Sequence, residues 1–217
     1  KEDIYKKYIE RSQNYINVFD GATRFFRGKR MDGNWESPFN PLAVGRAYTE
    51  ATAWQYRFFV PHDVNGMIQL FGGKEEFVAA LDDIFNTDAE IHGNLVDITG
   101  LIGHYVQGNE LSHHIAYLYN YVGEPWKTQK MSRRLLNEMY HPTPEGIIGN
   151  EDCGQMSAWY ILSSMGLYSV CPGSNEYVLT TPLFEKVVVH LANGRTLTIL
   201  ANDPQKNIYI TKVELNG

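Results

Sequence analysis

The spacing of apolar residues changes along this chain, from a helical period over most of its length to a strand-like pattern near its end. Apolar side chains recur every three or four positions in several segments, which predicts amphipathic helices. These segments span residues 2–27, 48–56, 64–70, 74–85 and 126–140. Glycine and proline between them predict short turns. The sequence therefore predicts consecutive antiparallel helices of the kind that build an α-hairpin barrel.

The C-terminal part follows another pattern. Apolar and β-branched residues form three short runs, at residues 187–191, 195–200 and 207–215. Asparagine, glycine and proline lie between the runs and predict turns. We therefore expect a mainly α domain over residues 1–179, followed by a small antiparallel β-sheet in residues 180–217.

Composition excludes several classes of function. The net charge is −6 and the Lys and Arg residues are dispersed, whereas nucleic acid and anionic membranes require a clustered basic face. No apolar run reaches the roughly 20 residues needed to span a bilayer. Cys153 and Cys171 permit one disulfide, and whether they pair stays open. The chain starts in an apparent helix and stops in an apparent strand region, which favours a fragment of a longer protein.

Residues 149–160 place two acids, Glu151 and Asp152, between glycines and just before an apolar run. This run predicts a helix start, where unpaired backbone N–H groups and the helix dipole favour an ionised carboxylate. A simple helix cap by Asn150 or Asp152 is the alternative.

Glu50 is predicted to lie in the first turn of the helix over residues 48–56, beside aromatic residues such as Trp54. Aromatic neighbours remove water from a carboxyl and so favour its protonated form. The alternative is a surface glutamate that the helix dipole stabilises.

Residues 107–119 combine an amide, a carboxylate and two histidines where a loop leads into a predicted helix. The oxygen ligands of Asn109 and Glu110 suit calcium. His113 and His114 are adjacent on a helix, point in different directions and do not easily bind one zinc ion. Hydrogen bonding of the two histidines in a packed corner is the alternative.

In an α-hairpin barrel, the acids at these predicted helix ends would lie on the same rim. Two carboxyls that face each other across a sugar suffice for glycoside hydrolysis, because one protonates the leaving oxygen and the other activates water. Glu50 suits the acid and Asp152 suits the base.

Three segments, 48–63, 108–119 and 149–160, resemble the family 92 glycoside hydrolases in the family's order. That family comprises calcium-dependent, inverting, exo-acting α-mannosidases, often called α-1,2-mannosidases. The resemblance implies an N-terminal β-sandwich followed by an (α/α)6 barrel, with the active site between them. This chain would hold only the later helical hairpins of the barrel and part of a terminal sheet.

The resemblance also implies roles for individual residues. Glu50 would be the general acid and Asp152 the general base. Calcium would help to flatten the sugar ring, with Asn109 and Glu110 as its ligands. The implied contacts to the substrate are Trp54, Glu110, His113, Asn150 and Glu151. Asn150 replaces an acid that is common in the family, and Leu111 replaces a proline.

The implied substrate is terminal α-linked mannose, as in N-glycan degradation, and the implied location is periplasmic or extracellular. Two alternatives stay open. One is a catalytically incomplete fragment that acts only as a carbohydrate-binding or structural module, without its β-sandwich. The other is a different (α/α) barrel hydrolase or lyase. The mannosidic linkage is not readable from these residues.

Overall fold

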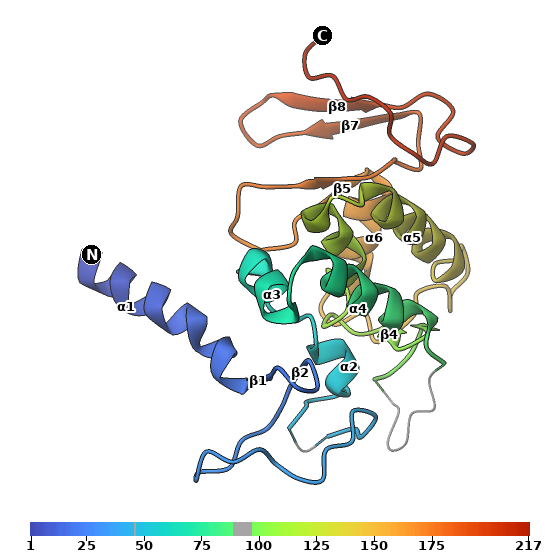
Figure 1. Ribbon diagram of the computed structural model, residues 1–217. Coiled ribbons are helices and arrows are strands. Elements are labelled where there is room, and N and C mark those ends of the chain that lie inside the picture. The colour runs from blue at the N-terminus through green and yellow to red at the C-terminus, as the bar shows by residue number, and fades with distance from the viewer. Residues whose placement is uncertain (46, 89–96) are drawn as a thin grey trace. The chain divides into compact units, whose positions relative to one another are not determined.

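The computed structural model describes residues 1–45, 47–88 and 97–217. The chain divides into two compact units, Lys1–Ser112 and His113–Gly217. Both are rich in helices and contain small two-stranded antiparallel sheets (Figure 1), which agrees with the predicted fold class. The closure of an (α/α)6 barrel and the domain boundary at residues 179/180 stay predictions.

The first unit begins with a helix, a 3-10 segment and a very small hairpin, and continues with three helices and a second hairpin. These elements are α1 Glu2–Ser12, η1 Gln13–Val18, β1 Phe19–Asp20, β2 Phe25–Phe26, α2 Ala53–Tyr56, α3 Val64–Phe71, α4 Lys74–Asn86, β3 Leu101–Ile102 and β4 Tyr105–Val106.

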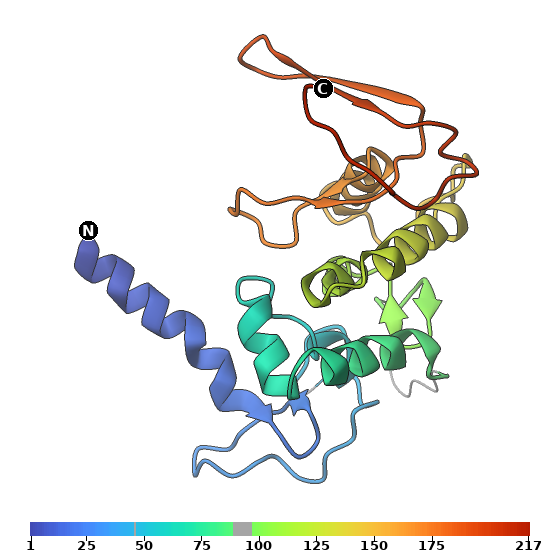
Figure 2. The same cartoon turned by 45° about the horizontal axis from the view of Figure 1, so that its top comes forward.

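The predicted first helix, residues 2–27, is longer than the helical segment in the structure. The α-helix ends at Ser12, and η1 continues it only to Val18. Asp20 then turns the chain, because its carboxylate accepts hydrogen bonds from Ala22 N at 3.1 Å and from Thr23 Oγ1 at 2.9 Å. No residue of α1 is buried, and α1 extends away from α3 and α4 in both ribbon views (Figure 2).

The α3–α4 hairpin agrees with the sequence prediction and holds the aromatic core of the first unit. Asp63 caps α3 by accepting from Gly66 N at 2.9 Å, and Gly72 ends it in the left-handed conformation. Phe58, Phe71 and Phe77 are fully buried and pack with ring centroids 5.2–5.6 Å apart. This cluster fixes the segment that leads into α3.

The second unit contains one 3-10 helix, two α-helices and two hairpins. They are η2 Ile115–Val122, α5 Pro125–Glu138, α6 Gln155–Ser164, β5 Leu167–Tyr168, β6 Val178–Leu179, β7 Lys186–His190 and β8 Thr196–Leu200. The predicted pair of C-terminal strands is confirmed, since β7 and β8 pair antiparallel with Val188 opposite Thr198.

The third predicted strand, residues 207–215, is wrong, because no strand forms there. The backbone of this segment is hydrogen-bonded by side chains and not by a neighbouring strand. Ile208 O accepts from Thr181 Oγ1 at 2.8 Å, and Ile210 N donates to Gln129 Oε1 at 2.7 Å. Gln129 of α5 and Thr181 therefore hold this segment through its backbone.

Trp159 of α6 lies at the centre of the core of the second unit. It is 1% exposed, stacks on Tyr140 with centroids 5.7 Å apart, and donates from Nε1 to His113 O at 3.1 Å. Tyr117 is also fully buried and stacks on Tyr168 at 4.1 Å. Burial raises the pKa of Tyr117 well above its usual value. The start of α6 is thereby tied to η2.

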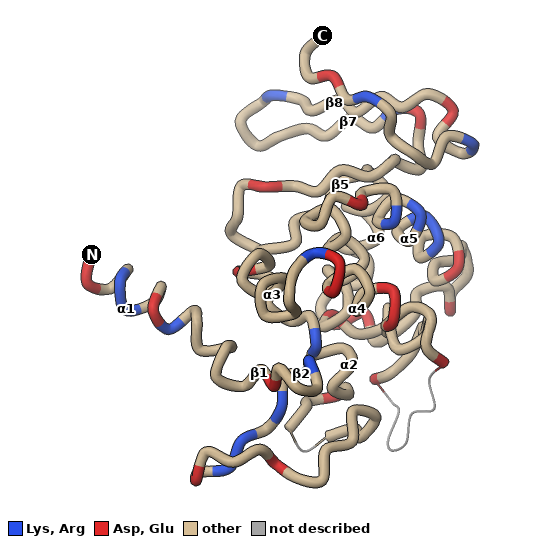
Figure 3. Tube along the Cα trace, in the orientation of Figure 1, with Lys and Arg blue, Asp and Glu red and all other residues tan. Residues whose placement is uncertain are grey.

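Charges are spread over the chain, although α5 carries several basic residues (Figure 3). Arg133, one of them, is 7% exposed and donates to Pro182 O at 2.9 Å. Lys127 and Arg134 pair with the carboxylates of Glu124 and Glu138, so these three side chains already have partners. No described helix combines the length and apolar content required to cross a bilayer.

Candidate active site

Glu50 does not lie in a helix, contrary to the prediction. It occupies an exposed bend, and α2 begins only at Ala53. Thr52 caps α2, since its Oγ1 accepts from Trp54 N at 3.2 Å while Gln55 Oε1 accepts from Thr52 N at 2.8 Å. This Thr-x-x-Gln capping box sets the helix start after Glu50.

The backbone of Glu50 is strained, with a φ of +60°. A residue with a Cβ pays of order 1 kcal/mol or more for this left-handed conformation, and such residues concentrate at functional sites. The rigid capping box two residues later holds the bend. Glu50 is therefore an exposed residue on an anchored backbone.

Trp54 packs face to face on His104, with ring centroids 4.3 Å apart and an angle of 11°. Phe25 contacts the Trp54 ring edge at 5.3 Å. His104 is 1% exposed, and burial lowers its pKa, which favours the neutral imidazole. Within the described residues Trp54 Nε1 and His104 Nδ1 are buried and lack a hydrogen-bond partner. Unsatisfied buried polar atoms are rare and are a feature of functional sites.

His104 is a candidate site residue that sequence reasoning missed. A tight turn at Gly103 places it, with a φ of +58° and only 2.6 Å between an added Cβ and Ile84 O. His104 N donates to Ile84 O at 2.7 Å, and Gln55 Nε2 donates to His104 O. The sequence gives no spacing signal that joins His104 to Trp54, because long-range packing brings them together.

Asn109 and Glu110 follow β4 in a turn and not at a helix start. Asn109 is 3% exposed, and its Oδ1 accepts from Leu111 N at 3.3 Å. Glu110 is exposed. The 3-10 helix η2 begins later, at Ile115.

The donor chemistry of Asn109 and Glu110 fits calcium, which binds six to eight oxygen ligands in proteins. Asn109 Oδ1 keeps a free lone pair beside its bond to Leu111. Two side chains supply only part of a calcium shell. Among the described residues no group of three or more His, Cys, Asp or Glu is placed to hold a metal ion, so further ligands would come from carbonyls, water or sugar hydroxyls.

The turn before α6 has an unusual backbone. Glu151, Asp152 and Cys153 have φ values of +65°, +38° and +61°, between Gly149 at +82° and Gly154 at +89°. Three consecutive non-glycine residues in the left-handed region are costly, at roughly 1–2 kcal/mol each. The surrounding structure must hold this turn, as expected for a functional segment.

Glu151 provides part of that support. Its Oε1 accepts from Ser157 N at 3.4 Å and its backbone O accepts from Met156 N at 3.3 Å. Glu151 Oε2 is buried and has no hydrogen-bond partner in the described part of the chain. Glu151 therefore takes a capping role at α6, and its second oxygen is available to a ligand.

Asp152 remains exposed, and no hydrogen bond of its carboxylate is seen among the described residues. Its backbone is fixed, because Asp152 N donates to Asn150 O at 2.8 Å and its O accepts from Gln155 N at 3.3 Å. Asn150 is also exposed. Cys153 and Cys171 are free thiols.

His113 is 1% exposed, and its Nδ1 pairs with Gln155 Nε2 at 3.2 Å. A hydrogen donated by this amide nitrogen makes Nδ1 the acceptor, which favours the tautomer with the imidazole proton on Nε2. Gln155 is the first residue of α6 and was not predicted as a site residue. It links His113 to the turn that carries Asp152.

The predicted residues thus fall into two groups. Glu50, Trp54, Asn109 and Glu110 belong to the first unit, and His113, Asn150, Glu151 and Asp152 to the second. The separation of the Glu50 and Asp152 carboxyls stays a prediction.

Solved structures of mannosidases are similar to this chain. One is a family 92 α-mannosidase from Bacteroides thetaiotaomicron in complex with mannoimidazole, with 40% identity and a TM-score of 0.88 over 94% of this chain and 28% of that one. Another is a family 92 inverting mannosidase from the same organism, with 36% identity and a TM-score of 0.81 over 94% of this chain and 29% of that one.

A curated protein of Arthroderma benhamiae, described as an uncharacterized secreted glycosidase, is 30% identical over 98% of this chain and 29% of its own length. The chain thus spans about three tenths of these relatives. The glycosyl hydrolase family 92 catalytic domain matches residues 1–217. The chain therefore belongs to glycosyl hydrolase family 92.

Proposed function

We propose that this chain carries the acid and the base of an inverting exo-α-mannosidase. Glu50 is the general acid and Asp152 is the general base. The proposal rests on a backbone conformation that both residues adopt. Each is an exposed, non-glycine residue in the left-handed region and lies shortly before a helix. Family membership and the two mannosidase structures support the class of substrate.

In the proposed reaction Glu50 gives its proton to the glycosidic oxygen as the bond to the anomeric carbon breaks. Asp152 takes a proton from a water molecule that attacks the same carbon from the opposite face, which inverts the configuration. The carboxyls of inverting enzymes lie roughly 6.5–9.5 Å apart, which leaves room for this water.

The remaining residues would hold the terminal mannose. His113 would contact the sugar from the segment before η2, where Gln155 Nε2 lies 3.2 Å from its Nδ1. Glu151 Oε2 and Trp54 Nε1 are buried atoms without partners in the described chain, so they offer an acceptor and a donor to sugar hydroxyls. Glu110 and Asn150 would make further contacts from exposed positions.

Asn109 and Glu110 would hold the proposed calcium ion. When bound, calcium would bind sugar hydroxyls and favour a flattened ring, which resembles the oxocarbenium-like transition state. Asn109 is the fixed ligand of the two, because its amide is buried and bonded to Leu111 N.

The proposed substrate is a mannose-containing glycan, as in N-glycan degradation, and the proposed location is periplasmic or extracellular. The secreted glycosidase of Arthroderma benhamiae supports this location. The proposed enzyme completes its pocket with an N-terminal β-sandwich domain, consistent with relatives of more than three times this length.

A catalytically incomplete carbohydrate-binding module is the second candidate, and the short span of the chain relative to its relatives favours it. An assay with an alkyl α-mannoside separates the candidates. Turnover that Glu50→Gln and Asp152→Asn abolish supports the enzyme. Binding of mannose without any turnover supports the module.

A further inference from the structure

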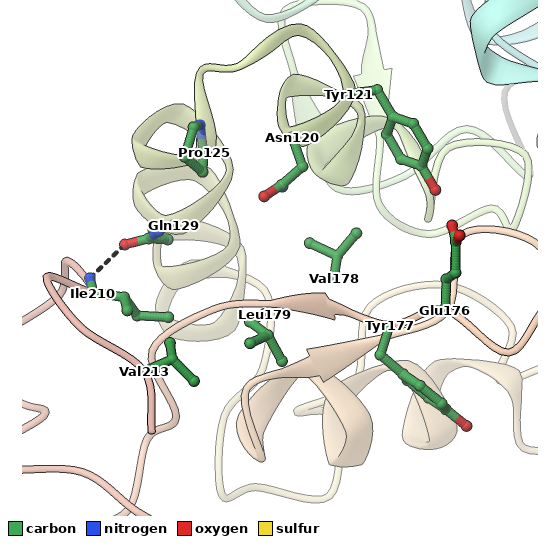
Figure 4. Close-up of a pocket in the computed structure, with 10 residues that line it drawn as sticks. All are labelled: Asn120, Tyr121, Pro125, Gln129, Glu176, Tyr177, Val178, Leu179, Ile210 and Val213. Carbon is green, nitrogen blue, oxygen red and sulfur yellow. Dashed lines mark hydrogen bonds between the residues drawn. The ribbon is translucent and has the colours of Figure 1, made fainter. Parts of the chain in front are cut away.

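A cavity of about 430 Å³ lies in the second unit, between the end of η2, the start of α5, strand β6 and the C-terminal segment (Figure 4). Its walls combine aromatic, aliphatic and polar side chains, and we call it the tyrosine pocket. Residues that define it include Asn120, Tyr121, Glu176, Tyr177, Leu179 and Val213. We propose that the tyrosine pocket binds one hexopyranose unit of a glycan, at a place separate from the catalytic residues.

Asn120 supplies a fixed hydrogen-bond acceptor. Its Nδ2 donates to Tyr117 O at 3.1 Å and to Thr128 Oγ1 at 2.8 Å, so both amide hydrogens are used. Oδ1 has no partner among the described residues and is left to accept. Figure 4 shows Asn120 extending from its helix toward β6.

Tyr121 and Glu176 form a polar edge. Their phenol and carboxyl groups point toward one another on one side of the pocket (Figure 4). Burial, and then the charge of Glu176, raise the pKa of Tyr121, so the phenol keeps its proton and can donate it to a ligand. Within the described chain neither group has a hydrogen-bond partner, and a hydroxyl placed between them can bind both.

The rest of the lining is largely apolar. Val178 of β6 extends toward Asn120, and Ile210 and Val213 of the C-terminal segment lie on the side of Gln129 (Figure 4). Val213 is 60% exposed. The bond between Ile210 N and Gln129 Oε1, at 2.7 Å, fixes the C-terminal segment on this side. Water therefore covers apolar side chains that line a preformed pocket.

A hexopyranose matches both sides at once. Its hydroxyls are donors for Asn120 Oδ1 and the Glu176 carboxylate, and its C–H face packs on apolar or aromatic side chains. The volume lies toward the small end of the roughly 300–1,000 Å³ of ligand pockets, which suits a small ligand. None of the lining residues is among the proposed catalytic or mannose-binding residues. The pocket would thus hold a second part of a branched glycan.

Methyl-labelled Val and Leu resonances of this 24.8 kDa chain test the proposal by NMR. Titration with methyl α-D-mannopyranoside should shift the signals of Val178, Leu179 and Val213 saturably, with a dissociation constant of about millimolar size, as expected for one sugar ring. The Glu151→Gln variant, changed at a proposed mannose contact, should show the same shifts, which distinguishes this pocket from the proposed active site.

Tyr121→Phe should weaken this binding about fivefold, because the phenol donor is lost while the ring stays. Tyr209→Phe is the matched control, since Tyr209 is 47% exposed and lies outside the pocket. Cyclohexylmethanol and an alkylammonium ion are comparison ligands. The proposal is overturned if the sugar shifts none of the three signals at 50-fold the expected constant, or if either comparison ligand binds more tightly than the sugar.

Discussion

Gln155 Nε2 and His113 Nδ1 are 3.2 Å apart, and this pair joins the first residue of α6 to a buried imidazole of the segment before η2. The contact favours the tautomer of His113 that carries its proton on Nε2. It also ties the backbone that follows Asp152, because Gln155 N donates to Asp152 O at 3.3 Å. One glutamine thus orients a proposed sugar donor and the turn of the proposed base.

Removal of this amide should impair substrate binding. We expect Gln155→Ala to raise KM for an α-mannoside about fivefold, since one hydrogen bond contributes about 1 kcal/mol. Nitrogen-15 NMR of His113 should show the proton on Nε2 in the native chain and a mixture of tautomers in the variant. Gln69→Ala, on the exposed surface of α3, is the control. An unchanged tautomer in Gln155→Ala would refute the orienting role.

The acid and the base should respond differently to the leaving group. Glu50→Gln and Asp152→Asn should each lower kcat by about 10²–10⁴ on an alkyl mannoside. A dinitrophenyl leaving group needs no proton, so it should restore most of the activity of Glu50→Gln and little of that of Asp152→Asn. Glu10→Gln, on exposed α1, should behave like the native chain. Rescue of both variants, or of neither, would exclude these roles.

Chelation should test the proposed calcium ion. We expect EDTA to lower activity at least tenfold, and added Ca²⁺ to restore it, because oxygen ligands of this kind favour calcium over softer metals. Glu110→Gln should raise the Ca²⁺ concentration required for half-maximal activity. Glu145→Gln is the control, on an exposed residue of another turn. Full activity after exhaustive chelation would contradict the proposal.

Substitution of Gly154, in the left-handed turn before α6, should destabilise the fold. Gly154→Ala should lower the free energy of unfolding by about 1–2 kcal/mol, because φ is +89° there and an added Cβ meets no atom closer than 3.8 Å. The cost is therefore conformational. Gly21→Ala, where a Cβ meets nothing within 4 Å, should change stability little. Equal denaturation midpoints for the two variants would show that the turn relaxes freely.

Asp20 should make the first unit less stable in acid. Burial raises its pKa, but hydrogen bonds from Arg27 and Thr23 outweigh burial and lower the pKa below the usual value. A carboxyl with a lowered folded pKa stabilises the fold above its unfolded pKa of about 4, and this contribution is lost as pH falls through the folded pKa. Asp20→Asn should thus be less stable at pH 6 and lose less stability between pH 5 and pH 2. Parallel curves for the two proteins would contradict this.

Local signals predicted α3, α4 and the β7–β8 hairpin well. Asp63 and Gly72 lie at the two ends of α3, and the glycine between β7 and β8 marks the turn of that hairpin. Such elements depend on residues close in sequence, so their pattern is visible without a structure.

The candidate site depends on backbone conformations and contacts that no pattern in the sequence predicts. Glu50 and Asp152 adopt positive φ values although neither is a glycine, so a helical pattern placed Glu50 in a helix that begins later. His104 meets Trp54 only through packing between distant segments. Residues 207–215 have strand-forming composition, but side chains such as Gln129 bind their backbone.

The stereochemistry of the product tests the central claim most directly. Proton NMR can follow the anomeric signal during hydrolysis of an α-mannoside by this protein, before the free sugar equilibrates. If Glu50 and Asp152 act as acid and base on opposite faces of the sugar, β-mannose appears first and the α-anomer forms later by mutarotation. Initial release of α-mannose would contradict the account, because it requires a covalent intermediate and a nucleophile in place of a base.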